Sequence, residues 1–360
     1  MPNHALALLI VTAILIAVGL IVISGLEVSA QMNLYGGVAR DIFRSHIMKL
    51  AVGVVLMIVM CFVDYRYHER YASFYYMLAL VLLILPYTFP PIAGSRRWIL
   101  LPGFSFQPSE FAKLTTIVCI ASYVKKNKDR MRSFTHGFLK PMLLICPIVL
   151  LIILEPDLSS ALIVFFIALL VLYSHGSRMI YILSTFGLIA FFLYAAQRFG
   201  IFLRGYQISR LKAFFSGDLP EQVMQAVRAF KEGGLVGKGV GLGEVKLSVP
   251  AVVTDFIFAA IGEELGLVGI VSVVSLFFLL VWTMLKLVEN SNDTFVTGFV
   301  SGLALLIMIQ VLVNLGVVSG LLPVTGVTLP FMSHGGSSIA IMMASIGVVV
   351  NMATSGSEAK

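Results

Sequence analysis

Three carboxylates stand beside a strongly apolar stretch, where residues 253–266 read VTDFIFAAIGEELG. A carboxylate in hydrocarbon costs several kcal/mol unless it is paired or hydrated. If Thr254 caps a helix, Asp255 lies in its first turn, with Glu263 and Glu264 roughly 80° and 180° further round. We therefore expect Asp255 to face a cavity, where it could act as a general base, or to serve only as a helix N-terminal acid. We expect Glu263 and Glu264 to be paired internally, for example with a lysine or arginine of a neighbouring helix.

A second polar group lies in GSRRWILLPGFSFQPSEFAKL, residues 94–114. Pro108 suits the first position of a helix, which places Glu110 in the first turn and Lys113 on the same face. This spacing predicts either an intramembrane ion pair facing a polar groove, or an acid that only satisfies the helix N-terminus. The flanking residues that could line this groove and its mouth are Arg96, Arg97 and Gln107.

Three further stretches combine polar residues with irregular backbone. In EPDLSSA, residues 155–161, Pro156 breaks a helix and Asp157 can cap the next one or serve the site. The glycine-rich stretch 231–243 lacks the pattern of a nucleotide-binding loop and suits close approach to a sugar or lipid head group. Residues 314–338 contain two prolines before SHGGSS, and backbone this irregular at membrane depth must be buried or line a wet cavity.

The composition is that of a protein embedded in a membrane. Of 360 residues, 59% are hydrophobic and 12% are charged, whereas soluble chains carry about 25% charged residues. The three cysteines lie scattered in apolar runs, which argues against a disulfide framework or a metal cluster. These features predict an all-α polytopic membrane protein.

The apolar runs predict about ten transmembrane helices and one long extracytoplasmic loop, residues 197–253. The first run has no lysine or arginine before it and is about 20 residues long, which favours a retained span over a cleaved signal peptide. The fifth and sixth runs are separated by three residues and should form a tight hairpin. The predicted spans are 5–24, 47–63, 73–89, 109–124, 141–154, 158–173, 179–196, 254–287, 295–318 and 336–353.

Basic residues in the short loops favour cytoplasmic termini. With that orientation the inner loops hold Arg66, Arg70, Lys125, Lys126, Lys128, Arg130, Arg132, Lys140, Arg178 and Lys286. The short outer loops hold Arg40, Arg44, Lys49, Arg96, Arg97 and Lys113. The long outer loop holds further basic residues, among them Arg210 and Lys212. Cations near the outer surface suit an anionic head group such as a lipid pyrophosphate.

Taken together, these stretches resemble the SEDS family of bacterial cell-envelope proteins, which includes FtsW, RodA and SpoVE. The matching motifs are spread in order along the chain, and the ordered set is far more specific than any single motif. They are GSRRWI, FQPSE-FAK-L, PDL, GGL-G-G-G-G, TDFIFA-I-EELG-G and N-GVV-GLLPVTG-LPF-S-GGSS. The resemblance implies that residues 1–360 form a single SEDS-type transmembrane domain in the bacterial inner membrane, with both termini cytoplasmic.

The resemblance also implies an activity and its partners. The family polymerises lipid II into peptidoglycan strands at the outer face of the inner membrane. Its partners are a class B penicillin-binding protein as transpeptidase and other membrane proteins of the divisome or elongasome, with no role for nucleic acid. The essential acid of the family falls on Asp255, and its functional polar residues fall on Gln107, Glu110, Lys113 and Asp157. A septal, FtsW-like role is favoured over a sidewall, RodA-like role.

This chain departs from the family pattern at several places, which puts loop contacts and substrate fit in question. Val253 replaces the usual histidine of HTD, and Ser159 replaces the usual glycine after PDL. Glu232 replaces the serine of SGG, and His334 replaces the tyrosine of S-Y-G-G. None of these departures removes the essential acid.

These residues predict a mechanism. Asp255 takes a proton from the sugar hydroxyl, and basic side chains hold the departing pyrophosphate. The substrate-binding residues that we predict are Arg96, Arg97, Gln107, Glu110, Lys113, Asp157, Arg210, Lys212 and Ser333. A divalent cation, Mg²⁺ or Mn²⁺, held by Asp255 could share this duty, and no organic cofactor is expected. The alternatives are a flippase that transports the polyprenyl-linked precursor and a non-catalytic division scaffold.

Overall fold

The computed structural model describes residues 2–32, 40–91, 95–101, 104–185, 187, 216 and 219–358. Helices dominate it, with a single short strand pair in the described ranges. The helices from the amino terminus to the turn after α7 are α1 Pro2–Met32, α2 Arg40–Phe62, α3 Tyr65–Arg70, α4 Ala72–Ile84, α5 Pro108–Lys126, α6 Lys140–Leu154 and α7 Leu158–Ser174. The later ones are α10 Glu221–Gly233, α11 Ile257–Glu289, α12 Thr294–Val318 and α13 Gly336–Glu358. The strands β1 Ile99–Leu101 and β2 Phe104–Phe106 pair in antiparallel register.

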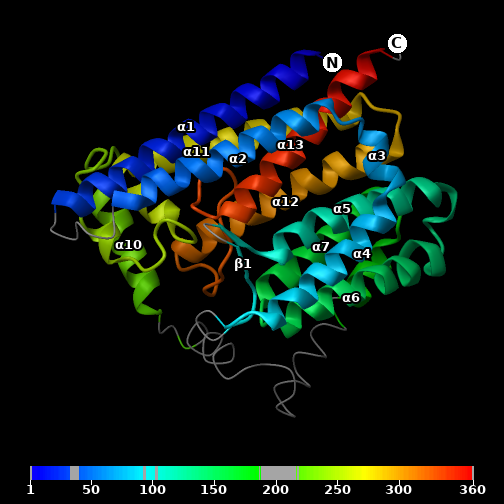
Figure 1. Cartoon of the computed structure of the whole chain (residues 1–360), viewed down its shortest axis with the longest axis horizontal. Helices are drawn as coiled ribbons and strands as arrows, with labels where there is room; N and C mark the ends of the chain where they lie inside the picture. Colours follow the sequence, from blue (N-terminus) through cyan, green and yellow to red (C-terminus); the bar gives the residue numbers. More distant parts are fainter. Residues whose placement is uncertain are drawn as a thin grey trace.

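The long helices form two groups that meet along α5 and α12. In one group α13 packs along α2, and α11 packs between α1 and α12 (Figure 1). In the other group α4, α6 and α7 surround α5. Because α12 also contacts α5 and α7, it joins the two groups. The amino and carboxyl termini lie at the same end of the molecule, beside α3, while α10 lies at the opposite end (Figure 1).

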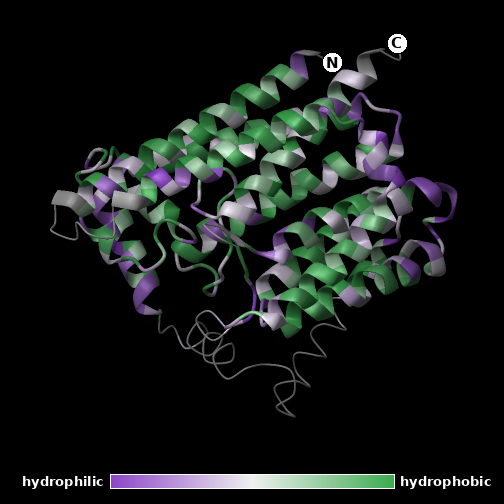
Figure 2. Cartoon of the chain, viewed as in Figure 1, coloured by the Kyte–Doolittle hydropathy of each residue, from purple (hydrophilic) through white to green (hydrophobic). Residues whose placement is uncertain are grey.

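Nine of the ten predicted spans coincide with helices. Six of these helices are long and apolar enough to cross a membrane, and α4 and α7 are shorter apolar helices. The seventh predicted span, 179–196, is described only at 179–185 and 187, where it is helical. Apolar residues cover the middle of the helices, and polar residues gather around α3 at one end and α10 at the other (Figure 2). This is the pattern of a polytopic membrane protein, as predicted.

Small residues allow α12 and α5 to pack closely against each other. A side-chain carbon added at Gly298 would lie 3.0 Å from the Ala121 side chain, and one at Gly302 would lie 2.8 Å from Ile117. Helices in lipid gain no hydrophobic drive from packing on each other, so close contact through small residues supplies the attraction instead. This packing fixes the middle and carboxyl half of α5, the helix that carries several predicted site residues, against α12.

The predicted hairpin between the fifth and sixth spans is confirmed. The helix α6 ends at Leu154 and α7 begins at Leu158. Asp157 caps α7, because its Oδ1 accepts a hydrogen bond from the backbone N–H of Ser160 at 3.1 Å. The capping role predicted for Asp157 is therefore present, and the hairpin tip lies at the α10 end of the molecule.

The span predicted at 254–287 differs from the structure in two ways. The helix α11 begins only at Ile257, and it is interrupted at Gly266, where φ is 67° and ψ is −164°. Glycine tolerates this backbone because it has no side chain to clash. The break follows from a close approach, since any side chain at Gly266 would collide with the backbone of Leu235 and Gly237. The segment that carries Glu263 and Glu264 is therefore a separate short helix before the long span.

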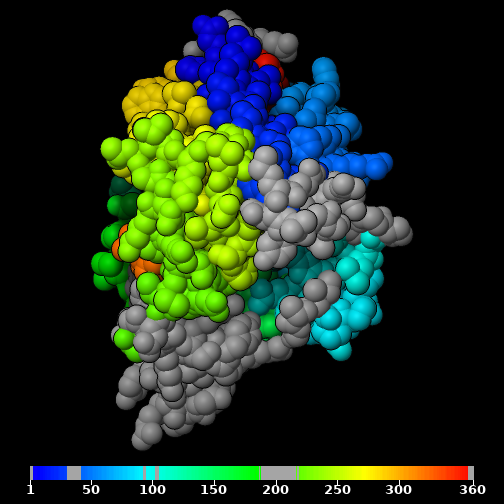
Figure 3. Space-filling model, turned by 90° about the vertical axis from the view of Figure 1, so that its left-hand side faces the viewer, coloured from blue at the N-terminus to red at the C-terminus, as the bar shows by residue number. Residues whose placement is uncertain are grey.

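The described part of the long loop is ordered around this short helix. It contains α10 and a 3₁₀ turn, Val245–Ser248, and both contact α11. Figure 3 shows this segment as a continuous surface beside the end of α1. The segment covers the end of α11 next to Asp255 and so shapes the surroundings of the candidate site.

Candidate functional site

Asp255 lies in a turn before α11, not in the helix. The Ala251 carbonyl accepts hydrogen bonds from the backbone N–H groups of Thr254 and Asp255, both at 3.0 Å, and of Phe256 at 3.2 Å. The residue that caps α11 is Phe256, and no side chain forms a cap hydrogen bond there. The predictions that Thr254 caps the helix and that Asp255 occupies its first turn were therefore wrong, because these residues are wound into the preceding turn.

The turn that carries Asp255 is fixed by side chains from two other segments. The Asn314 amide on α12 donates to the carbonyl of Asp255 at 2.9 Å and to that of Val327 at 2.7 Å. The Ser333 hydroxyl donates to the Thr254 carbonyl and accepts the N–H of Leu329 at 2.9 Å. These bonds hold the backbone of Asp255 in one position, which a catalytic carboxylate requires.

The carboxylate of Asp255 is half-buried and faces a small residue. A side-chain carbon built at Gly326 would lie 3.5 Å from Asp255 Oδ2, so glycine leaves room beside the carboxylate. The sequence missed Asn314 and Gly326 as parts of the site. Both lie in the irregular segment that begins at residue 314 and in the motif N-GVV-GLLPVTG, but neither the segment nor the motif indicated that these two residues contact Asp255.

Glu110 and Lys113 form the predicted intramembrane ion pair. Lys113 Nζ lies 2.7 Å from Glu110 Oε1, and both side chains are almost completely buried. The alternative, in which Glu110 serves only to satisfy the helix N-terminus, is not supported. The N–H of Gln107 donates to the Ser337 hydroxyl at 2.9 Å and not to Glu110. A buried lysine that already neutralises a neighbouring acid is poorly placed to bind a second anion.

Gln107 connects three segments at the amino end of α5. Its side-chain amide donates to Asp157 Oδ2 at 3.3 Å, and its backbone N–H reaches Ser337 on α13. The Ser337 hydroxyl in turn donates to the carbonyl of Ser105 at 3.0 Å. Ser337 lies in the first turn of α13, so these hydrogen bonds join the amino end of α5 to α7 and to the start of α13.

The two predicted arginines bind backbone carbonyls. Arg97 donates from Nε to the carbonyl of Glu155 at 2.9 Å and from a terminal nitrogen to that of Pro156. Arg96 is exposed and donates to the carbonyl of Tyr87 at 3.1 Å. Arg97 therefore holds the tip of the α6–α7 hairpin, whereas the Arg96 side chain is exposed. The predicted residues Arg210 and Lys212 lie outside the described residues.

Glu155 is completely buried, and neither carboxyl oxygen has a hydrogen-bond partner in the described part of the chain. Burial and the nearby Asp157 raise the pKa of its carboxyl from 4.5 to about 9, against a smaller opposing effect of Arg97. Between pH 4.5 and about 9, the Glu155 carboxyl keeps its proton in the folded protein and loses it in the unfolded chain. The folded state therefore loses stability as pH rises from 4.5 towards 9.

We expect Glu155→Gln to raise the thermal unfolding midpoint at pH 8 and to change it much less at pH 5. Glutamine has the shape of the protonated acid and releases no proton, so the variant loses the pH dependence that Glu155 imposes. Unfolding of the purified protein in detergent at both pH values measures this, with exposed Glu289→Gln as the control. Parallel pH dependence in the variant and the parent would contradict the assignment.

Glu263 and Glu264 are paired internally, as predicted, but their partners come from the loop. Glu263 accepts the backbone N–H groups of Glu244 at 2.9 Å, Val245 at 3.0 Å and Lys246 at 2.6 Å. Glu264 accepts the N–H of Gly241 at 3.1 Å and forms an ion pair with Lys246. The side chains of Lys246 and both glutamates are completely buried. This role of Lys246 was not predicted from the sequence.

The described residues do not build a metal centre. Across the described ranges, no group of three or more histidine, cysteine, aspartate or glutamate residues is placed to hold a metal ion. The cation predicted at Asp255 would need most of its oxygen ligands from the substrate or from solvent. It remains a prediction, and no catalytic step is assigned to it.

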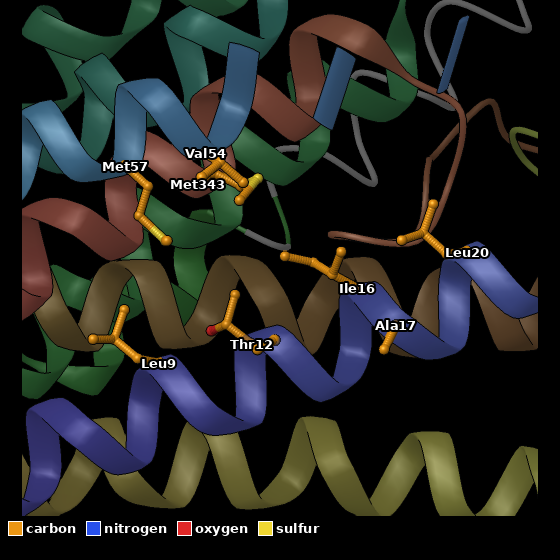
Figure 4. A pocket seen from close by; sticks show the side chains of 9 residues that line it. Leu9, Thr12, Ile16, Ala17, Leu20, Val54, Met57 and Met343 are labelled. Atoms are coloured by element: carbon orange, nitrogen blue, oxygen red, sulfur yellow. The ribbon is translucent and has the colours of Figure 1, made fainter. Parts of the chain in front are cut away.

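An apolar pocket of about 300 Å³ lies between α1, α2 and α13 (Figure 4). Its walls include Leu9, Ile16, Val54 and Met343, and Thr12 supplies a hydroxyl. Figure 4 shows these side chains facing one another across the gap between α1 and α2. The pocket suits a hydrocarbon chain, but none of the predicted site residues lines it.

Comparisons with known proteins agree with this architecture. A probable peptidoglycan glycosyltransferase FtsW of Trichlorobacter lovleyi is 34% identical over 98% of this chain and 93% of its own length. The stage V sporulation protein E of Bacillus subtilis is 31% identical over 96% of both chains. A chain of a solved structure described as "Structural coordination of polymerization and crosslinking by a peptidoglycan synthase complex" matches with a TM-score of 0.78 and 28% identity over 97% of both chains.

A crystal structure of the rod shape determining protein RodA of Thermus thermophilus matches with a TM-score of 0.70 and 27% identity, over 96% of this chain and 95% of its own. The family model described as "Cell cycle protein", which covers FtsW, RodA and SpoVE, matches residues 5–358. The chain belongs to the FtsW/RodA/SpoVE family of cell cycle proteins.

Proposed function

We propose that this chain is a peptidoglycan glycosyltransferase that polymerises lipid II at the outer face of the bacterial inner membrane. The observation that carries the proposal is the half-buried Asp255, whose backbone is held by Asn314 and Ser333 at the α10 end of the bundle. Relatives named as peptidoglycan glycosyltransferases match almost the whole chain, which supports the reaction type. In this proposal residues 1–360 act as one transmembrane unit.

The placement of charge supports the proposed orientation. The termini, α3 and the basic turn after α5 lie at one end of the molecule, opposite α10 (Figure 1). Lys125, in the last turn of α5, pairs there with Glu69 at 2.8 Å and with Asp293 at 3.0 Å. Because lysine and arginine favour the cytoplasmic side, this end is cytoplasmic. Asp255 then lies towards the outer surface.

The proposed reaction joins two sugars and releases one lipid carrier. The 4-hydroxyl of the acceptor sugar attacks the anomeric carbon of the donor, and Asp255 takes the hydroxyl proton. The bond from that carbon to the pyrophosphate oxygen breaks, and the lipid pyrophosphate departs with the bonding electrons. A half-buried carboxylate in a fixed turn is suited to this proton transfer, which typically contributes about 10²–10⁴-fold to the rate.

The residues near Asp255 divide between positioning and substrate contact. Asn314 and Ser333 position the base, while Gln107 and Asp157, which are hydrogen-bonded to each other, keep their proposed roles as substrate contacts. Arg96 and the predicted contacts Arg210 and Lys212 keep their proposed roles towards the pyrophosphate. Lys113 acts instead through its ion pair with Glu110.

A class B penicillin-binding protein is the proposed transpeptidase partner. The similarity to a chain of a peptidoglycan synthase complex, over 97% of both chains, supports a partner of this kind. The many relatives named FtsW support a septal rather than a sidewall role, although RodA has the same fold.

Incubating the purified chain and its partner with labelled lipid II tests the proposed reaction. We expect glycan strands that separate as a ladder on a gel. A flippase would instead move labelled lipid II across liposomes without forming strands. Translocation without polymer from active, correctly folded protein would overturn the proposal.

A further inference from the structure

A cluster of cationic and imidazole side chains lies behind the Asp255 turn, where α2 meets the segment before α13. Lys49 Nζ contacts His334 Nε2 at 2.6 Å and the His334 carbonyl at 3.4 Å. The ring of His46 stacks on that of His334 with centroids 5.4 Å apart. We call Lys49, His46 and His334 the outer cation cluster. The sequence counted Lys49 only as one of the outer basic residues, and the proposed reaction assigns no role to any of the three.

A backbone hydrogen bond connects this cluster to the turn that carries Asp255. The N–H of His334 donates to the Val253 carbonyl at 2.7 Å, two residues before Asp255. The preceding residue, Ser333, donates to the Thr254 carbonyl. A ligand on Lys49 would therefore lie next to the segment that holds the proposed base.

Among the described residues, no acid balances the charge of Lys49. In the described part of the chain, no carboxylate oxygen lies within 4.0 Å of its ammonium group, which instead contacts the imidazole and the carbonyl of His334. Lys49 is half-buried within the apolar span of α2, between the exposed Met48 and the buried Leu50. A cation at such a position is costly unless a counter-charge reaches it, so the arrangement favours an anionic ligand.

The imidazoles add donors rather than charge. Burial, together with a smaller effect of the Lys49 charge, lowers the pKa of the His334 ring to about 4, so this ring is neutral at pH 7. Its Nε2 accepts from the ammonium group, which places the ring proton on Nδ1, an atom without a partner in the described residues. His46 is completely buried, and neither ring nitrogen has a partner in these residues. The cluster thus offers a cation and unused hydrogen-bonding groups.

The surroundings of Lys49 select the kind of anion. Its neighbours Ile47 and Met48 are 45% and 55% exposed on the apolar surface of α2, which faces lipid in a membrane-spanning helix. An anion that arrives here from the bilayer must carry a long apolar chain. A phosphate group fits the donors, since its oxygens accept several charge-assisted hydrogen bonds.

We infer that the outer cation cluster binds the pyrophosphate of a polyprenyl pyrophosphate, with Lys49 as the direct contact and His334 positioning it. This inference rests on the proposed function and adds a subsite to it. His334 occupies the position where the family pattern has tyrosine, so an imidazole that accepts from Lys49 is a feature of this chain.

The test measures binding alone, without polymerisation. Purified full-length protein in detergent is titrated with undecaprenyl pyrophosphate, uncharged undecaprenol and inorganic pyrophosphate. We expect Lys49→Met to weaken undecaprenyl pyrophosphate binding about ten-fold or more, as the loss of a charge-assisted hydrogen bond predicts. Lys49→Arg should retain most of the affinity, and undecaprenol binding should not change.

The chain supplies a matched control. Lys140 makes a similar contact with His136, at 3.1 Å, but this pair is exposed at the opposite end of the molecule. Lys140→Met should leave all three affinities unchanged, and thermal unfolding verifies that every variant is folded. Wild-type affinity of Lys49→Met for undecaprenyl pyrophosphate would overturn the inference, as would an equal loss of undecaprenol binding. Lysine-dependent binding of inorganic pyrophosphate alone would also overturn it, because the site would then be for a free anion.

The two proposals can fail separately. If the protein forms no glycan strands but Lys49→Met still weakens binding of undecaprenyl pyrophosphate, the proposed polymerase function fails and the lipid pyrophosphate site stands. If strands form and Lys49→Met binds as the parent does, the subsite fails and the polymerase function stands.

Discussion

Asp255→Asn is expected to slow glycan strand formation from lipid II about 10²–10⁴-fold. Asparagine preserves the shape of the side chain, and the backbone bonds from Asn314 and to Ala251 do not depend on the carboxylate. The substitution therefore removes proton acceptance and leaves the turn in place. The loss should fall on kcat, whereas binding of lipid II should change little.

The matched control is Asp129→Asn, an exposed acid in the basic turn after α5, at the end of the molecule opposite α10. This variant should polymerise lipid II at the parental rate. Thermal unfolding of both variants separates a catalytic loss from a folding defect. Strand formation by folded Asp255→Asn at the parental rate would remove Asp255 from the mechanism.

Lys246→Met destabilises the folded protein by about 3–5 kcal/mol, because it leaves the buried Glu264 carboxylate without its cation. Both side chains of this pair are completely buried, so water cannot replace the lost partner. The same pair joins the 3₁₀ turn Val245–Ser248 to α11, and the amide hydrogens of residues 237–246 should exchange faster in the variant. A lowered unfolding midpoint together with this faster exchange is the expected result.

A double variant separates lost charge balance from lost packing. Lys246→Met with Glu264→Gln should recover part of the stability, since no unpaired buried charge remains. The exposed pair Lys286–Glu289 supplies the control, and Lys286→Met should change stability by at most about 1 kcal/mol. Equal and small effects of Lys246→Met and Lys286→Met would show that the buried pair does not hold the loop.

The predictions that succeeded rest on spacing within one helix or one hairpin. The pairing of Glu110 with Lys113 follows from a three-residue separation on a helix that Pro108 starts. The cap formed by Asp157 follows from the Pro156 break before it. Local geometry of this kind can be calculated from the order of residues alone.

The features that sequence could not supply depend on contacts between distant segments. Lys246 meets Glu264 only because α11 breaks at Gly266 and the loop folds back on it. Asn314 reaches the Asp255 carbonyl from another helix, 59 positions away. Arg97 is a further example. An arginine in this stretch of the sequence predicts anion binding, whereas in the fold its guanidinium donates hydrogen bonds to two backbone carbonyls.

The position of Asp255 in an outward-facing lipid II site is the central claim, and cysteine labelling tests it most directly. Asp255→Cys is introduced after Cys61, Cys119 and Cys146 are replaced by alanine, and a membrane-impermeant maleimide is applied to each side of the membrane. We predict labelling from the outer side, slowed by added lipid II. Labelling only from the cytoplasmic side, or labelling that lipid II does not affect, would contradict this account.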